Sequence, residues 1–196
     1  MCIQVRAATA DRWGDLVAVF GRRGEDPSWE WCQLFVKSGP SRALAAASSS
    51  DNRGALYDEI TSVAVPAGLI AYVDTCPVGW TRVGPRDGFP GVRGNRALAG
   101  VLSEEDAGVW WVACFAVDRR HRRAGVGAAL LRAAVVFARE QGATAVQGHP
   151  VDVARLRGSA VAGSALYTGT MAMFAAEGFT EVGRTHGTRP VMTLAL

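Results

Sequence analysis

The chain of 196 residues lacks several features that would each point to a class of protein. It has only four cysteines, at positions 2, 32, 76 and 114, and no C-x-x-C pair, which argues against a zinc ribbon or a dithiol redox motif. No apolar run reaches the roughly 18 residues of a membrane span, and the first residues lack the apolar core of a signal peptide. We therefore expect a cytoplasmic protein with reduced thiols and no membrane partner.

Lysine is also nearly absent, because Lys37 is the single lysine among 21 basic side chains. Against 18 acidic side chains this gives a net charge of +3, which is too small to indicate a nucleic-acid partner. Without Arg119, Arg120, Arg122 and Arg123 the balance would be 17 basic against 18 acidic side chains, a charge of −1. The positive excess is therefore local to one short run.

The composition, 49% hydrophobic and 20% charged, is that of a globular domain that buries a core without metal or disulfide links. We expect a helix over 10–22 with Thr9 as its N-cap. Segment 29–37 is rich in strand formers and is predicted to be a strand, with a helix as the alternative. Segment 40–62 is predicted to be helical in pieces, with a break at its Ser-Ser-Ser-Asp-Asn centre.

The second half of the chain has clearer patterns. A hairpin is predicted over 68–84, followed by a long surface connection over 85–108. The uninterrupted apolar run 109–117 predicts a central strand buried on both faces. An amphipathic helix follows from Ala128, and 143–148 predicts a returning strand, so this βαβ unit should hold two parallel strands.

The C-terminal third is predicted to contain one more helix, over 164–177, which Gly178 ends. A closing pair of strands is expected over 179–185 and 189–196.

The segment that carries chemistry is Arg122-Arg123-Ala124-Gly125-Val126-Gly127, which lies between the buried strand and the amphipathic helix. Its glycines allow a tight turn and a close approach of a ligand to the backbone. Free N–H groups and the dipole at a helix N-terminus favour a phosphate, and flanking arginines add charge-assisted hydrogen bonds. The pattern predicts a site for a diphosphate.

Two common phosphate motifs do not fit, since Leu130 stands where a dinucleotide fingerprint needs its third glycine and the Gly-Lys-Ser/Thr of a P-loop is absent. The segment matches R/Q-x-x-G-x-G/A instead, and here the sequence resembles the GNAT superfamily of acetyl-CoA-dependent N-acetyltransferases. Phe174 followed by Gly178-Phe179 resembles the second block of that superfamily. The resemblance covers about residues 66–196.

The resemblance implies an α/β (α+β) fold with a single mixed, mostly antiparallel twisted sheet of about 6–7 strands. A central parallel pair would be splayed into a V, and about four helices would flank the sheet. We expect one domain over 1–196, with an N-terminal helical, acceptor-side region over 1–65 and an acetyl-CoA-binding core over 66–196.

The resemblance also implies where acetyl-CoA, the acyl donor, would bind. Its pyrophosphate would lie on the turn formed by Arg122, Arg123, Ala124, Gly125, Val126, Gly127 and Ala128. Its pantetheine would run along Phe115, Ala116 and Val117. The backbone N–H of Phe115 would face the thioester carbonyl, where it would stabilise the developing oxyanion.

The acid and base are harder to place. Phe174 stands where the superfamily usually has a tyrosine acid, and it has no proton to donate. Tyr167 is a candidate acid, with a packing role as the alternative, and water is a further proton source. His149 is a candidate base because its ordinary pKa is near neutrality, and a hydrogen-bonded loop histidine is the alternative reading. Asp118 and Asp152 are expected to be turn or cap residues.

Several other side chains are expected in the core. Cys114 should pack as a small hydrophobe. Most tryptophans are also core candidates, although one of Trp29 and Trp31 could line an acceptor pocket.

The leading function is acetyl transfer from acetyl-CoA to a primary amine of a small molecule or protein, without a metal, by a monomer or a homodimer. A non-catalytic acyl-CoA-binding module is the alternative, motivated by Phe174. An RNA-binding domain using the 119–123 run is a weaker third, because Asp118, Glu140 and the acids at 104–106 interrupt a basic face. Those three acids are expected to lie in a solvated loop; the alternative is that they attract a cationic acceptor.

Overall fold

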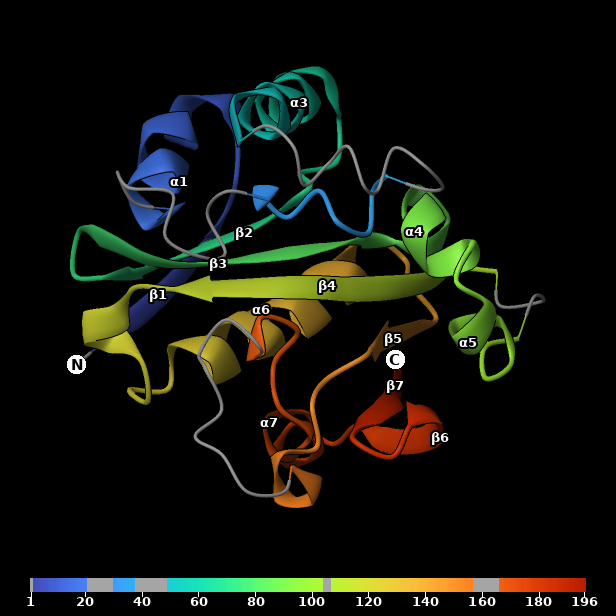
Figure 1. Cartoon of the computed structure of the whole chain (residues 1–196). Coiled ribbons are helices and arrows are strands. Elements are labelled where there is room, and N and C mark those ends of the chain that lie inside the picture. The colour runs from blue at the N-terminus through green and yellow to red at the C-terminus, as the bar shows by residue number, and fades with distance from the viewer. Residues whose placement is uncertain (1, 21–29, 38–48, 104–106, 157–165) are drawn as a thin grey trace.

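The computed structural model describes residues 2–20, 30–37, 49–103, 107–156 and 166–196. Within them, seven strands form one sheet in the order β1-β2-β3-β4-β5-β7-β6 (Figure 1). The strands are β1 Ile3–Ala7, β2 Gly68–Val73, β3 Cys76–Pro85, β4 Val109–Val117, β5 Ala145–Gly148, β6 Thr180–His186 and β7 Arg189–Ala195. The β4–β5 pair is parallel and the other neighbouring pairs are antiparallel, which confirms the predicted mixed sheet.

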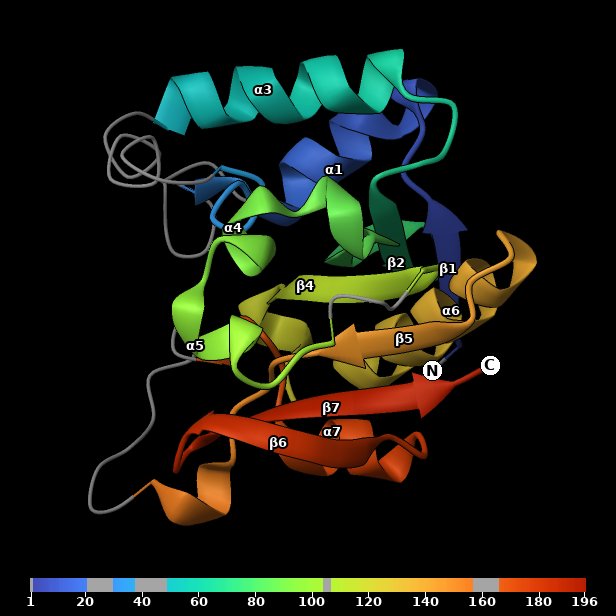
Figure 2. The same cartoon turned by 90° about the vertical axis from the view of Figure 1, so that its right-hand side faces the viewer.

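Helices cover both faces of the sheet. Those in the described residues are α1 Trp13–Phe20, α3 Ser49–Ser62, α4 Pro90–Arg93, α5 Arg96–Ala99, α6 Val126–Glu140 and α7 Met171–Ala176. Figures 1 and 2 show α1 and α3 over one face, α6 and α7 over the other, and α4 and α5 at one end. None of these helices is long and apolar enough to cross a membrane.

Strand β4 is the centre of the molecule, as its apolar run predicts. Each of its residues except Val117 is buried. Its register against β3 shifts between Arg82 and Val83, so that one residue of β4 is extra at this point. After this bulge, Phe115 packs on the α6 side with Val112, whereas Cys114 faces α1 and α3. The bulge thus decides which β4 side chains face the α6 side.

The parallel pair opens into the predicted V. Strand β5 pairs with residues 109–112 of β4 and ends at Gly148, whereas β4 continues to Val117. Segment 166–170 occupies the widening gap: the Phe115 N–H donates to the Tyr167 carbonyl at 2.5 Å, and the Val151 N–H donates to the Gly169 carbonyl at 3.0 Å. The two arms of the V are therefore bridged by a loop from much later in the chain.

Helix α6 confirms the βαβ unit and begins two residues before the predicted start. Val126, Leu130, Leu131, Ala134, Val135 and Ala138 are buried on the face that packs against the sheet. Gly142 follows the helix with a φ of +80°, a conformation that favours glycine.

The N-terminal region departs most from expectation. Ile3–Ala7 forms an unpredicted edge strand, in which partly buried and exposed residues alternate. Thr9 makes no side-chain cap hydrogen bond, although the helix that follows it is present. The strand predicted over 29–37 is wrong for residues 30–37, which form turns, because Trp31 and Cys32 have positive φ values of 47° and 53°.

Two predicted loops are instead packed. Helix α3 begins at Ser49, within the expected Ser-Ser-Ser-Asp-Asn break, and residues 40–48 of this segment lie outside the described residues. Leu56 and Ile60 anchor one face of the helix, and the Asn52 side chain accepts a hydrogen bond from Lys37 Nζ at 2.8 Å. The 85–108 connection folds into α4 and α5, and its Val92 and Leu98 side chains are fully buried. Its acidic cluster at 104–106 lies outside the described residues.

The expectation of reduced thiols is wrong for two cysteines. Cys32 and Cys114 form a disulfide between the 30–37 segment and β4, with Cα atoms 6.4 Å apart. Cys114 is buried, as predicted, but as half of this bond. Cys2 and Cys76 are free and exposed.

Candidate active site

The turn before α6 has the geometry of an anion cradle. Gly125 is the N-cap, with a φ of +85°, and the first helical hydrogen bond runs from the Ala129 N–H to the Gly125 carbonyl at 3.0 Å. The three N–H groups before it, those of Val126, Gly127 and Ala128, therefore have no acceptor within the helix. A Cβ added to Gly125 would meet no heavy atom within 4 Å, so the turn faces open space.

A cavity of about 680 Å³ lies against this turn, a size typical of small-ligand sites. Its walls are the end of β4, the turn, the start of α6 and segment 166–170 with Met173. Of the ten residues predicted to bind acetyl-CoA, all line the cavity except Ala116, which faces α1 and α3, and Ala124. One cavity thus joins the predicted phosphate turn to the predicted pantetheine strand.

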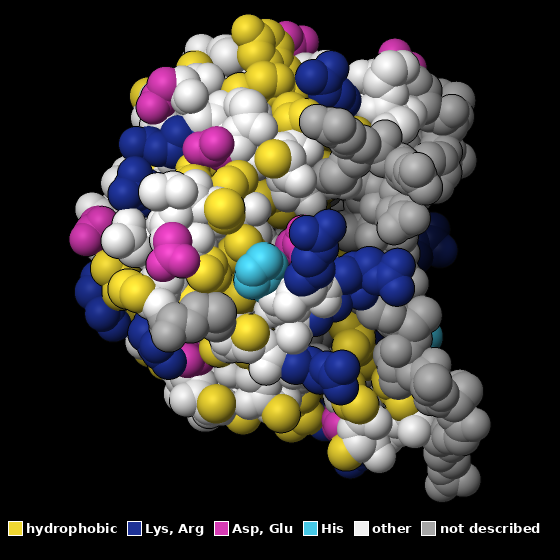
Figure 3. All heavy atoms as spheres, turned by 90° about the vertical axis from the view of Figure 1, so that its left-hand side faces the viewer, with side chains coloured by type: hydrophobic (Ala, Val, Ile, Leu, Met, Phe, Trp, Pro, Cys, Tyr) yellow, Lys and Arg dark blue, Asp and Glu magenta, His cyan; other side chains and the backbone are white. Residues whose placement is uncertain are grey.

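Positive charge borders this cavity. Arg119, Arg120, Arg122 and Arg123 are exposed, and all but Arg120 line the cavity. Figure 3 shows basic side chains gathered beside a histidine on this face of the molecule. Arg122 Nε donates to the Val117 carbonyl at 3.2 Å, which ties the turn to the end of β4. The arrangement suits a polyanionic ligand.

The predicted oxyanion donor has a partner within the protein. The Phe115 N–H points away from β3 into the V, where it donates to the Tyr167 carbonyl. Tyr167 lies in a turn before α7 and not in the helix predicted over 164–177, because Gly169 takes a φ of +80° and α7 begins only at Met171. A ligand that uses the Phe115 amide must displace the Tyr167 carbonyl.

The structure does not bring His149 to the cavity. Its side chain is buried beside β6 and β7, with Nε2 2.7 Å from Thr185 Oγ1. Burial, followed by the charge of Arg189, lowers the pKa of His149 from 6.5 to about 4. These features match the alternative reading, a hydrogen-bonded loop histidine.

This buried histidine should make stability depend on pH. The unfolded imidazole binds a proton near pH 6.5 and the folded one only near pH 4, so the unfolded state binds more protons between these values. The contribution of neutral His149 is therefore complete above pH 6.5 and is lost as the pH falls to about 4, by about 3 kcal/mol. Urea unfolding at several pH values should show this loss in the wild type. A His149→Gln variant with the same pH slope would contradict it.

Other predicted residues fall where their chemistry suggests. Phe174 is fully buried and packs edge-on against Phe115 at 6.3 Å and Phe179 at 4.9 Å, so it serves the core. The Asp118 carboxylate accepts the Arg120 N–H at 2.8 Å, as a turn residue should. Asp152 stands at the N-cap position of the 3-10 turn Val153–Arg155, as expected, although its side chain makes no cap hydrogen bond and forms an ion pair with Arg184 at 2.8 Å.

Sequence reasoning missed parts of the site. His121 lines the cavity, with Nδ1 3.7 Å from the Asp118 carboxylate, and its place in the 119–123 run was the available signal. Gly169, Thr170 and Met173 also line it. These residues reach the cavity because segment 166–170 lies in the V, and no local sequence pattern predicts that placement.

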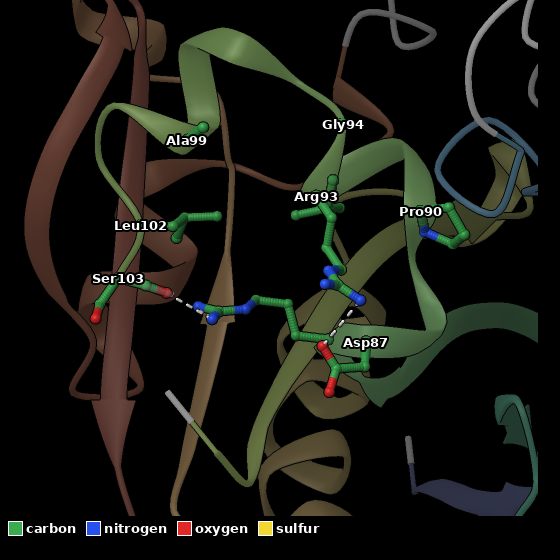
Figure 4. Close-up of a pocket in the computed structure, with 9 residues that line it drawn as sticks. Asp87, Pro90, Arg93, Gly94, Ala99, Leu102 and Ser103 are labelled. Atoms are coloured by element: carbon green, nitrogen blue, oxygen red, sulfur yellow. Dashed lines mark hydrogen bonds and ion pairs between the residues drawn. The ribbon is translucent and has the colours of Figure 1, made fainter. Parts of the chain in front are cut away.

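A second cavity, of about 600 Å³, lies at the α4–α5 end of the sheet (Figure 4). Its charged groups already have partners, since Arg86 donates to the Ser103 carbonyl at 2.7 Å and Arg93 lies 3.7 Å from Asp87. None of the predicted site residues lines this cavity. Within the described ranges, no cluster of three His, Cys, Asp or Glu side chains is suited to a metal ion.

Comparison with known proteins agrees with this geometry. The family model described as "Acetyltransferase (GNAT) family" matches residues 26–155, which is 130 of the 196 residues. No curated protein is similar enough in sequence to count as a relative.

Solved structures share the fold at low sequence identity. The PaiA N-acetyltransferase of Thermoplasma acidophilum in complex with coenzyme A has a TM-score of 0.55, 13% identity and full coverage of both chains. The GNAT domain of S. lividans PAT has a TM-score of 0.58 and 20% identity, with 99% of this chain and 90% of that one covered. The aminoglycoside acetyltransferase AAC(6')-Ib in complex with coenzyme A has a TM-score of 0.58 and 16% identity, with 99% of this chain and 95% of that one covered.

These matches confirm the GNAT fold that the sequence motifs imply, and acetyl-CoA is the donor that this family uses. The turn, the open space at Gly125 and the basic border fit such a donor. The chain belongs to the GNAT acetyltransferase family.

Proposed function

We propose that this protein is an N-acetyltransferase that moves the acetyl group of acetyl-CoA to a primary amine by direct attack in a ternary complex. The observation that carries the proposal is one cavity that is lined both by the Gly125 turn and by Phe115, whose N–H points into the V. A donor with a diphosphate at one end and a thioester at the other needs these two features in one space.

In this proposal the residues divide the work along the donor. The N–H groups of Val126, Gly127 and Ala128, with Arg122 and Arg123, hold the pyrophosphate. The β4 backbone from Phe115 to Val117 holds the pantetheine. The Phe115 N–H, released from Tyr167, donates to the acetyl carbonyl oxygen as negative charge develops on it.

The reaction also needs proton transfers, because the amine attacks in its neutral form and the thiolate leaves with negative charge. Phe174 cannot supply a proton, so the proposed acid is Tyr167, the tyrosine that lines the cavity. Water is the alternative proton source. His149 has no part in the proposal as a base, because it lies outside the cavity with a lowered pKa.

A second candidate is a GNAT-like module that binds an acyl-CoA without turnover. Two observations favour it. Phe174 stands in place of the usual tyrosine acid, and the Phe115 N–H already donates a hydrogen bond to the Tyr167 carbonyl. The two candidates differ in turnover and not in binding.

The test is a panel of primary amines incubated with acetyl-CoA: an aminoglycoside, a polyamine, amino acids and a lysine-containing peptide. We expect at least one acetylated product, detected by mass spectrometry, with one coenzyme A released per product. Parallel reactions without protein correct for spontaneous acetylation. Tight donor binding with no product from any amine would reject the enzyme and favour the binding module.

A further inference from the structure

The Cys32–Cys114 disulfide links the candidate site to a segment that has no regular structure. Cys114 lies on β4 directly before Phe115, whose N–H faces the V. Cys32 lies among the turns of residues 30–37, 82 positions earlier in the chain. A single covalent bond therefore fixes this segment against the central strand.

The segment is held in a backbone conformation that its own sequence does not favour. Trp31 and Cys32 are consecutive non-glycine residues with φ values of 47° and 53°, in the left-handed region that L side chains rarely adopt. Such conformations persist only where the surrounding structure enforces them. The disulfide is one such restraint, and it acts at one of the two strained residues.

Contacts lead from this segment to the site. A small crevice is lined by Cys32, Phe35, Cys114 and Tyr167, among others. The Phe35 ring stacks on Tyr167, with ring centroids 6.3 Å apart and planes 29° apart. The carbonyl of the same Tyr167 accepts the Phe115 N–H. The disulfide-bonded segment thus packs against Tyr167, the residue whose carbonyl accepts the hydrogen bond of the proposed oxyanion donor.

We propose that the Cys32–Cys114 bond is a reversible thiol–disulfide site that regulates donor binding; this rests on the proposed function. In the oxidised form, Phe35 holds Tyr167 against the Phe115 amide. Reduction lets Trp31 and Cys32 relax, frees Tyr167 to move and makes the amide available to the donor. The reduced protein is the form that binds acetyl-CoA more tightly.

The co-reactant is a thiol or dithiol reductant, and the exchange is balanced. A thiolate of the reductant attacks the sulfur of Cys32, because Cys32 is 6% exposed and Cys114 only 2% exposed. The S–S bond breaks, a mixed disulfide forms on Cys32, and the Cys114 thiolate leaves and takes a proton. A second thiol then releases Cys32 as a thiol, so the protein gains two electrons and two protons and the reductant becomes a disulfide.

The test measures the Kd of an acetyl-coenzyme A analogue in which oxygen replaces the thioester sulfur; it keeps the carbonyl that the Phe115 amide would bind and has no thiol that would itself attack the bond. A Cys2→Ser/Cys76→Ser background removes the exposed thiols, and alkylation with mass spectrometry verifies the state of the other two. Calorimetry is then run on the oxidised and the dithiothreitol-reduced protein, with a melting curve for each. A Cys32→Ser variant in the same background is the matched control.

We expect reduction to tighten binding by a factor of at least about 5, the lower end of measured couplings between sites. Cys32→Ser should bind like the reduced protein with or without dithiothreitol. Equal Kd values in both states, a shift that persists in Cys32→Ser, or unfolding on reduction would each overturn the regulatory role. If neither state binds the oxygen-ester analogue, the proposed function fails as well, so the two failures are distinguishable.

Discussion

Replacing Gly125 with Asp is expected to weaken coenzyme A binding by at least about 100-fold, which corresponds to about 2.7 kcal/mol. Gly125 has a φ of +85° and open space where its Cβ would be, so the carboxylate would project from the cradle where the pyrophosphate is proposed to lie. Like-charge repulsion then replaces attraction by the helix N-terminus. Isothermal titration calorimetry with coenzyme A measures the loss.

The fold should survive this change, because a Cβ at this position meets no heavy atom within 4 Å. The left-handed backbone costs about 1 kcal/mol, and Asp and Asn tolerate it better than most residues. Gly125→Asn is therefore the matched control, since it has the same shape and strain without the charge. We expect Asn to lose less than about 10-fold in affinity. Equal affinities of the Asp and Asn variants would show that no phosphate lies on this turn.

The largest expected effect on stability comes from Glu59→Gln. Arg82 on β3 is 1% exposed, and its guanidinium donates to both carboxylate oxygens of Glu59 on α3. Burial lowers the pKa of Arg82, and the nearby carboxylate opposes that shift. Removing the carboxylate leaves a buried cation without its counter-charge, so the free energy of unfolding should fall by about 3 kcal/mol. Urea unfolding at an unchanged m-value measures this.

The loss of stability should depend on which partner of the ion pair is replaced. Arg82→Met should cost less than Glu59→Gln, because the Glu59 side chain left behind is 29% exposed and can be hydrated. Glu177→Gln is the control, since its partner Arg132 is an exposed side chain, and it should cost less than about 1 kcal/mol. Equal losses in Glu59→Gln and Glu177→Gln would contradict the importance of the buried pair.

The parts of the fold that are predictable from sequence depend on local patterns. Strand β4 is buried on both faces, so its sequence is an unbroken apolar run. Helix α6 buries one face and shows the matching periodicity, and Gly125 and Gly142 are glycines where the backbone needs a positive φ. The phosphate turn is predictable for the same reason, since its chemistry is contained in six consecutive residues.

The rest depends on contacts between distant segments. Residues Trp31 and Cys32 form turns in place of the predicted strand because Cys32 is disulfide-bonded to Cys114, 82 residues later in the chain. No pattern within 30–37 indicates this bond. His149 is a candidate base by residue type, yet packing against β6 and β7 buries it. The hydrogen bond from the Phe115 N–H to the Tyr167 carbonyl depends on segment 166–170, which lies in the V but is about 50 residues away along the chain. Strand β1 is short and at the edge of the sheet, so its alternation spans only five residues.

Acetyl transfer itself, compared between the wild type and Gly125→Asp, is the most direct measurement. Both proteins are incubated with acetyl-CoA and the best amine of the panel, and the acetylated product is followed over time by mass spectrometry. If the cavity between β4 and α6 is the donor site, the wild type forms product and the Asp variant, folded by circular dichroism, forms at least about 100-fold less at low donor concentration. Equal rates for the two proteins would contradict donor binding at this site.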